Sequence, residues 1–168
     1  RNRIRVIDAR VVLRTDDGLL LTDNAAITAF LEARFPQPPL LGETPQEKAE
    51  IASWNWRVEF EGLLAVAEAM RNSSPAMANR ALSGPVDYAQ IPELAQRGLA
   101  RLRQFFLTLN ERLAAREFIA TDRFSIVDIT AVVAVDFARV VKVKADEQQH
   151  PHLVRWRAAM AQRPAMAL

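Results

Sequence analysis

The sequence predicts a mainly α protein, in which a β-hairpin and one helix precede an all-helical domain. Two short β-rich segments flank an Asp-Gly pair near the start of the chain, and a proline cluster at 36–39 follows them. After this cluster, apolar residues recur at helical spacing almost to the end. The 168 residues, 50% hydrophobic and 25% charged, are typical of a globular protein and are enough to form a packed core.

Composition and charge exclude several classes of function. Without cysteine, the chain can form no disulfide, thiolate metal site or thiol nucleophile, and a cytoplasmic protein is the default expectation. No uncharged apolar run approaches the roughly 20 residues that cross a bilayer, so we expect no membrane partner. The net charge is +2, and Arg1, Arg3, Arg5 and Arg10 alternate with apolar residues. This alternation favours a solvated strand face over a phosphate-binding arm, so we expect no nucleic-acid partner.

The first elements are a hairpin and a helix. Segments 11–13 and 19–21 are predicted to pair, because Asp17-Gly18 between them favours a tight turn. Apolar residues at 26, 27, 30 and 31 then share one helical face, and the helix ends where the prolines cannot continue it. We therefore place a first unit at 1–35, a linker at 36–44 and an all-α domain at 45–168.

A long helix is predicted from about 45 to 71, opened by a capping box of Thr44 and Glu47. This helix has two apolar faces, which contain Ala49, Trp56, Phe60, Leu63 and Ala67 on one side and Ile51, Trp54, Val58 and Ala65 on the other. We expect one face to pack on the domain's own core and the other to meet a partner subunit or a ligand cleft. Trp54, Trp56 and Phe60 are interpreted as core residues, and Arg57 and Glu61 as a solvated i, i+4 pair.

The remainder of the domain reads as an irregular connection over 72–91 and three further helices. The first runs from about 94 to 115, the second is opened by a capping box of Ser125 and Asp128, and the third contains Trp156. The second helix is apolar nearly all round and is expected at the centre of a bundle, with Asp128 in a structural role. His150 and His152 have no clustered partner ligands, so we expect no metal site.

Three segments, in this order and spacing, resemble the glutathione transferase superfamily. Segment 16–27, DDGLLLTDNAAI, is similar to the stretch that closes the family's thioredoxin-like domain. Segment 118–130 is similar to the family's buried capping box and hydrophobic staple, and segment 155–164 to the tail of its bacterial members. The resemblance spans nearly the whole chain. It implies an all-helical glutathione-transferase C-terminal domain preceded by a remnant of a thioredoxin-like domain.

The resemblance implies a dimeric cytoplasmic enzyme that binds glutathione as cosubstrate and transfers its thiolate to a small apolar electrophile, or exchanges it with a disulfide. Asp23 and Asn24 stand where the family holds the γ-glutamyl ammonium and carboxylate of glutathione, although the family has Glu and Ser there. Val11 is the nearest equivalent of the backbone donor to the cysteinyl part, but the family's cis-proline is absent from 10–13. The alternative is that Asp23 and Asn24 only cap a helix.

The catalytic residue is unknown, because the family's catalytic Tyr, Ser or Cys lies in a segment for which the chain has no room before Arg1–Arg10. A bound glutathione without such a donor would titrate near a free thiol, at a pKa of about 8.5, so the chain alone is expected to be a poor transferase. Either the chain is part of a longer protein, which we favour because Ile27, Phe30 and Leu31 need cover, or it is a truncation. The alternative function is a non-catalytic dimerisation or interaction module.

Overall fold

The computed structural model describes the backbone of residues 3–7 and 10–166 and the side chains of residues 12–165. The chain divides into two compact units, Arg1–Leu41 and Gly42–Leu168, and each is described by itself. The expected solvated face of Arg1, Arg3, Arg5 and Arg10 lies outside the described side chains.

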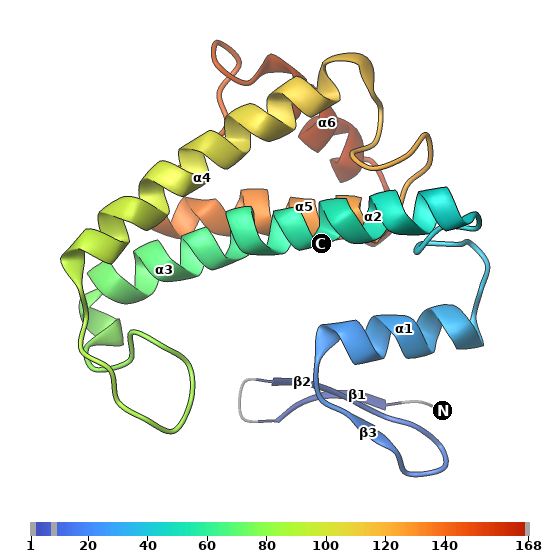
Figure 1. The fold of residues 1–168 in the computed structure, drawn as a ribbon, viewed down its shortest axis with the longest axis horizontal. Helices are drawn as coiled ribbons and strands as arrows, with labels where there is room; N and C mark the ends of the chain where they lie inside the picture. The colour runs from blue at the N-terminus through green and yellow to red at the C-terminus, as the bar shows by residue number, and fades with distance from the viewer. Residues whose placement is uncertain (1–2, 8–9, 167–168) are drawn as a thin grey trace. The chain divides into compact units, whose positions relative to one another are not determined.

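The first unit contains an antiparallel sheet in the order β1 (Arg3–Ile7), β2 (Arg10–Arg14) and β3 (Leu20–Leu21) (Figure 1). The predicted hairpin is confirmed, with Leu13 opposite Leu21. Gly18 in its turn has φ +94°, a conformation that favours glycine, and the Thr15 N–H donates to the Leu19 carbonyl at 3.0 Å. The Asp-Gly signal therefore identified the turn correctly.

Helix α1 (Asn24–Arg34) follows the hairpin, and its Ile27 is buried. The helix ends at Phe35, before the proline cluster, as the sequence predicts, and the Gln37–Pro38 peptide bond is cis. The Glu32 carboxylate accepts the N–H groups of Leu40 and Leu41, at 3.2 and 2.9 Å. These bonds connect the last turns of α1 to the chain that follows the prolines.

The second unit begins with the predicted long helix, which the structure divides into three parts. These are α2 (Pro45–Arg57), the π-helical segment η1 (Val58–Leu63) and α3 (Leu64–Ser73). The capping box is confirmed, because the Glu47 N–H donates to Thr44 Oγ1 at 3.2 Å and the Glu47 carboxylate accepts the Thr44 N–H. The π-helical segment is absent from the sequence prediction. The contiguous segments α2, η1 and α3 form what we call the rod, and η1 inserts a wider turn at its middle.

The other elements of the unit are mostly helical. They are η2 (Pro75–Met77), α4 (Pro92–Arg112), η3 (Leu113–Ala115), α5 (Ile126–Phe137), η4 (Ala138–Val141), α6 (Pro151–Ala161) and η5 (Pro164–Met166). Helix α4 packs along α3, whereas α5 packs against α2 and η1 (Figure 1). A Cβ on Gly98 of α4 would lie 2.8 Å from the Ala65 carbonyl oxygen and from the Ala69 nitrogen. The glycine thus permits close approach of the two helices.

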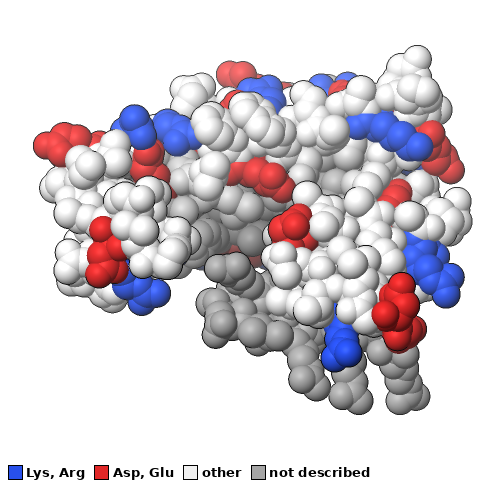
Figure 2. Space-filling model, turned by 60° about the horizontal axis from the view of Figure 1, so that its bottom comes forward, with Lys and Arg blue, Asp and Glu red and all other residues white. Residues whose placement is uncertain are grey.

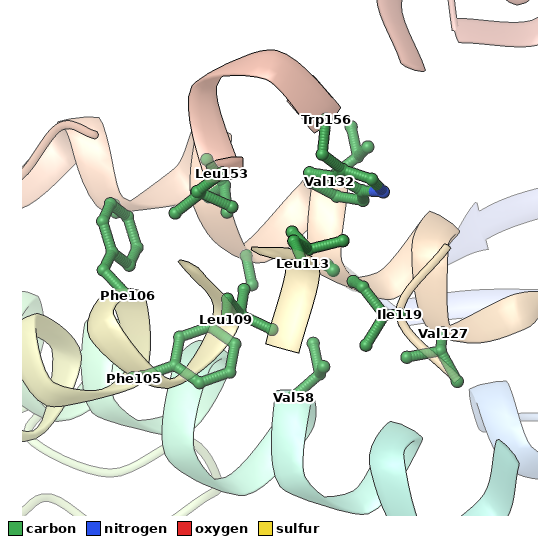
Figure 3. Close-up of a cluster of buried hydrophobic side chains, with 14 of the residues drawn as sticks. Val58, Phe105, Phe106, Leu109, Leu113, Ile119, Val127, Val132, Leu153 and Trp156 are labelled. Atoms are coloured by element: carbon green, nitrogen blue, oxygen red, sulfur yellow. The ribbon is translucent and has the colours of Figure 1, made fainter. Parts of the chain in front are cut away.

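One apolar cluster holds this unit together. The side chains labelled in Figure 3 come from η1, α4, η3, α5 and α6 and from the loop that precedes α5. Phe105, Leu109, Val127 and Trp156 are among those almost completely buried. Helix α5 is largely buried, as predicted, at Val127, Ala131 and Ala134, but Val133 is 52% exposed, so the helix is not enclosed on all sides. In the part of the chain that is described, no helix is long and apolar enough to cross a membrane.

Candidate functional site

The first candidate site is the turn that connects β3 to α1. Asp23 is the N-cap of α1, with extended backbone (φ −138°, ψ 156°), and its Oδ1 accepts the Ala26 N–H at 2.8 Å. The Asp23 carbonyl accepts the Ile27 N–H at 3.1 Å, which begins the helix. Asp23 and Asn24 are both solvent-exposed. The capping role that the sequence offered as an alternative is therefore present.

Capping by Asp23 leaves some polar groups of this turn without hydrogen-bond partners. Within the described residues, no group donates to Asp23 Oδ2, and none accepts from the N–H groups of Asn24 and Ala25. These two N–H groups point from the positive end of α1, where an anion is stabilised. A carboxylate oxygen beside free helix N–H groups can hold a zwitterionic group, the ammonium on the oxygen and the carboxylate on the amides.

Val11 lies in β2, opposite Val6 of β1, and its side chain is outside the described part of the chain. The register of β2 and β3 pairs Leu13 with Leu21. Val11 precedes Leu13 by two residues, and Asp23 follows Leu21 by two residues. The fold thus brings the backbone of Val11 and the start of α1 to the same end of the hairpin.

The second candidate site is an exposed surface on the rod of the second unit, formed by Trp56, Phe60 and Leu64, which we call the aromatic face. Trp56 is 59% exposed and Phe60 44% exposed, and their rings stack with centroids 4.9 Å apart. The prediction that Trp56 and Phe60 are core residues is wrong, because α5 covers the opposite face of the rod. The sequence signal for this site was the i, i+4 spacing of the two rings.

The opposite face packs on the domain's own core, as predicted. Ile51, Val58 and Ala65 are buried there, and Trp54 is half-buried. The guanidinium of Arg57 lies 4.7 Å from the Trp54 ring centroid. Arg57 also forms the predicted ion pair with Glu61, at 3.2 Å. Sequence analysis therefore identified the two apolar faces but not which of them the protein covers.

A cluster of charges fixes the backbone beside the aromatic face. Arg101 of α4 donates to the Phe60 carbonyl at 2.7 Å, and its guanidinium lies 4.8 Å from the Phe60 ring centroid. Glu68 of α3 forms ion pairs with Arg97 and Arg101. The hydrogen bond from Arg97 lowers the pKa of Glu68, and the charges of both arginines add to this effect. These contacts connect α4 to the segment that carries Phe60.

The capping box of α5 has a structural role, as the sequence predicts. Asp128 Oδ1 accepts the Ile119 N–H at 3.1 Å and the Trp156 indole N–H at 3.2 Å, and Oδ2 accepts the Ser125 N–H at 3.0 Å. Burial raises the pKa of the Asp128 carboxyl, and these hydrogen bonds act in the opposite direction. The carboxylate is buried and fully used, so it leaves no group for a ligand.

Neither histidine belongs to a metal cluster. His150 is buried, its Nδ1 lies 3.4 Å from Asp146 Oδ2, and its ring makes an edge contact with Phe106. Across the described residues, no group of three or more His, Asp or Glu side chains is arranged to hold a metal ion. On the face drawn in Figure 2, basic side chains are interspersed with acidic ones, and neither sign forms a continuous surface.

The family model that matches this chain is "Glutathione S-transferase, C-terminal domain", over residues 69–164. Glutathione S-transferase 2 of Saccharomyces cerevisiae is 33% identical over 156 residues, which is 92% of this chain and 64% of that protein. Elongation factor 1-gamma of Carassius auratus is 27% identical over 84% of this chain and 29% of that protein. The chain thus spans less than two thirds of these relatives.

Solved structures show the same fold. A glutathione S-transferase domain-containing protein of Marinobacter aquaeolei has a TM-score of 0.82 at 33% sequence identity. The similarity covers 93% of this chain and 73% of that one.

Proposed function

This chain belongs to the glutathione S-transferase family, and we propose that it binds glutathione and forms part of an enzyme that transfers the glutathione thiolate to an electrophilic small molecule. The observation that carries the proposal is the hairpin-to-helix turn, where Asp23 Oδ2 and the first N–H groups of α1 lack partners among the described residues. Such a turn suits the γ-glutamyl end of glutathione, which has an ammonium beside a carboxylate.

In this arrangement, Asp23 Oδ2 accepts hydrogen bonds from the γ-glutamyl ammonium, while Oδ1 continues to cap α1. The carboxylate of the same group accepts the N–H groups of Asn24 and Ala25, and the Asn24 side-chain amide donates to it as well. Val11 supplies backbone groups to the cysteinyl part, from the strand across the hairpin. The site needs no metal, and we place the protein in the cytoplasm.

Calorimetric titration with glutathione tests this site, provided that the capping and binding roles of Asp23 are separated. Asp23→Ser keeps a hydroxyl cap but removes the carboxylate, so it should leave stability nearly unchanged. A charge-assisted hydrogen bond contributes about 1.5–3 kcal/mol, so Asp23→Ser should weaken glutathione binding by about tenfold or more. Asp87→Ala, which removes an exposed carboxylate elsewhere, should bind normally. Equal affinity in Asp23→Ser and the unchanged protein would refute the assignment.

We also propose a homodimer that buries the aromatic face. An exposed stack of two large rings is typical of a protein interface. Light scattering at micromolar concentration should give twice the 18.9 kDa of one chain, and Trp56→Ser combined with Phe60→Ser should give a monomer. Leu82→Ser, at another exposed apolar position, should remain dimeric. A monomer for the unchanged protein would refute the dimer.

The second candidate is a non-catalytic glutathione-transferase-like module for dimerisation or interaction. It is favoured by the similarity to elongation factor 1-gamma, a protein that is not named as a transferase. Titration with millimolar glutathione separates the two functions, because the chain alone is expected to be a poor transferase in either case. A stable dimer that does not bind millimolar glutathione is the result that supports the module.

A further inference from the structure

A cavity of about 440 Å³ opens on the surface of the second unit, remote in sequence from the α1 turn and outside the aromatic face. Its walls come from α5 and η4, from the segment that follows η4, and from α6. The volume lies within the range of about 300–1,000 Å³ that is typical of small-molecule sites. The proposed transferase function makes no use of this cavity.

One wall of the cavity is apolar. Val135 of α5 is buried, Val154 of α6 is half-buried, and Ala158 and Ala161 lie next to Val154 on the same helical face. The two alanines are short, so the space above them stays open between α6 and the segment that follows η4. An apolar group that binds here would be removed from water and would contact carbon atoms on both sides.

The other wall is positively charged. Arg157 donates to both carboxylate oxygens of Asp136, at 3.1 and 2.6 Å, and Arg139 lies 3.6 Å from the same carboxylate. Lys144 has no carboxylate partner within the described residues. The cavity lining thus carries three cations, and two of them, Arg157 and Arg139, contact the Asp136 carboxylate, which leaves a net charge of +2 for these four groups. The Arg139 side chain is 65% exposed, so its guanidinium can exchange the Asp136 carboxylate for an incoming anion.

Lys144 is held in place by the chain on either side of it. Lys142 has φ +61° and ends η4, and the Val143 N–H donates to the Ala138 carbonyl at 3.2 Å. Val143 and Ala145 both pack against the apolar core, so the backbone of the residue between them is fixed. An ammonium on a fixed backbone loses less entropy when it binds an anion than one on a mobile loop.

We propose that this cavity binds a small organic monocarboxylate with an apolar body. The body contacts Val135, Val154 and Ala158, and the carboxylate accepts hydrogen bonds from Lys144 and Arg139. Asp136 keeps Arg157 in its present position. The cavity therefore selects a ligand with one charged end and one apolar end.

Titration with octanoate, followed by backbone amide NMR of the full chain, tests this proposal. Saturable shifts are expected for amides of 144–145 and 154–161, and they should persist when glutathione is present. Lys144→Gln and Arg139→Gln should each raise the dissociation constant about tenfold, because each removes a charge-assisted hydrogen bond. Lys142→Gln, a neighbouring exposed cation outside the cavity, should change it by less than about twofold.

Two further measurements distinguish specific binding in the cavity from non-specific binding to the surface. Octan-1-ol has a similar apolar body without the charge and should bind at least about tenfold more weakly than octanoate. Ala158→Phe fills the cavity from the exposed side of α6 and should abolish the shifts without unfolding the chain. Absence of saturable shifts, shifts mapped to other residues, or equal effects of Lys144→Gln and Lys142→Gln would each overturn the proposal. None of these results depends on glutathione binding.

Discussion

Replacement of Asp128 by alanine tests how the second unit is held together. The substitution removes the acceptor of three buried N–H groups, those of Ile119, Ser125 and the Trp156 indole. A buried donor left without a partner costs about 1–3 kcal/mol, so the three together cost about 3–9 kcal/mol. The substitution also recovers the desolvation cost of the carboxylate, the same cost that raises its pKa. We therefore expect a loss of about 3–5 kcal/mol.

The expected cost of Asp128→Ala is a large part of the total unfolding free energy. Domains are stable by about 5–15 kcal/mol, so Asp128→Ala should remove roughly a fifth or more of the unfolding free energy. Urea unfolding at pH 7, followed by circular dichroism and tryptophan fluorescence, measures it. The slope m should stay unchanged if the variant still folds. The transition temperature should fall by about 10 °C, since a chain of this size loses about 2–4 °C per kcal/mol.

Two variants give this measurement its controls. Asp136→Ala removes a carboxylate from the same helix that is half-exposed and pairs with Arg157, and it should cost under about 1 kcal/mol. Asp128→Asn keeps one acceptor oxygen but turns an amide NH₂ toward the remaining donors, so its cost should lie between the two alanine variants. Equal destabilisation by Asp128→Ala and Asp136→Ala would refute the reasoning, because buried and exposed carboxylates would then be equivalent.

Two further predictions concern the contact of α3 with α4. Arg97 lowers the pKa of Glu68 from 4.5, so this carboxylate stabilises the fold above that pH and loses its contribution as the pH falls through the lowered pKa. The difference in unfolding free energy between the unchanged protein and Glu68→Gln, measured by urea unfolding at several pH values, should therefore shrink toward acid pH. Gly98→Ala should destabilise by about 1–3 kcal/mol in the same assay, because its Cβ would meet backbone atoms of Ala65 and Ala69 at 2.8 Å.

The parts of the fold that could be predicted are those determined by neighbours in sequence. Both capping boxes, Thr44 with Glu47 and Ser125 with Asp128, need only four consecutive residues, and both are present. The turn at Gly18 likewise depends only on a few consecutive residues. In each case, the side chain and the backbone group that it satisfies lie within one turn, so distant packing cannot change the outcome.

The parts that could not be predicted depend on contacts between distant segments. The exposure of Trp56 and Phe60 follows from which face of the rod α5 covers, and the helical wheel treats both faces alike. The π-helical segment η1 lies where the rod meets α5 and α4, and Gly62 within it leaves room for the ring of Phe105. The cationic cavity joins residues from 135 to 161, whose positions only the tertiary fold determines.

Asp23 and Asp128 are carboxylates at helix N-termini that differ in how many of their oxygens the protein itself uses. Both carboxylates lie at a helix N-terminus and accept backbone N–H groups there. Asp128 is buried, and its two oxygens accept hydrogen bonds from three parts of the chain. Substitution of Asp128 should therefore lower the unfolding free energy. Asp23 is exposed and uses one oxygen on Ala26. The capacity to bind a ligand therefore depends on the acceptor that capping leaves over, which the capping pattern alone does not specify.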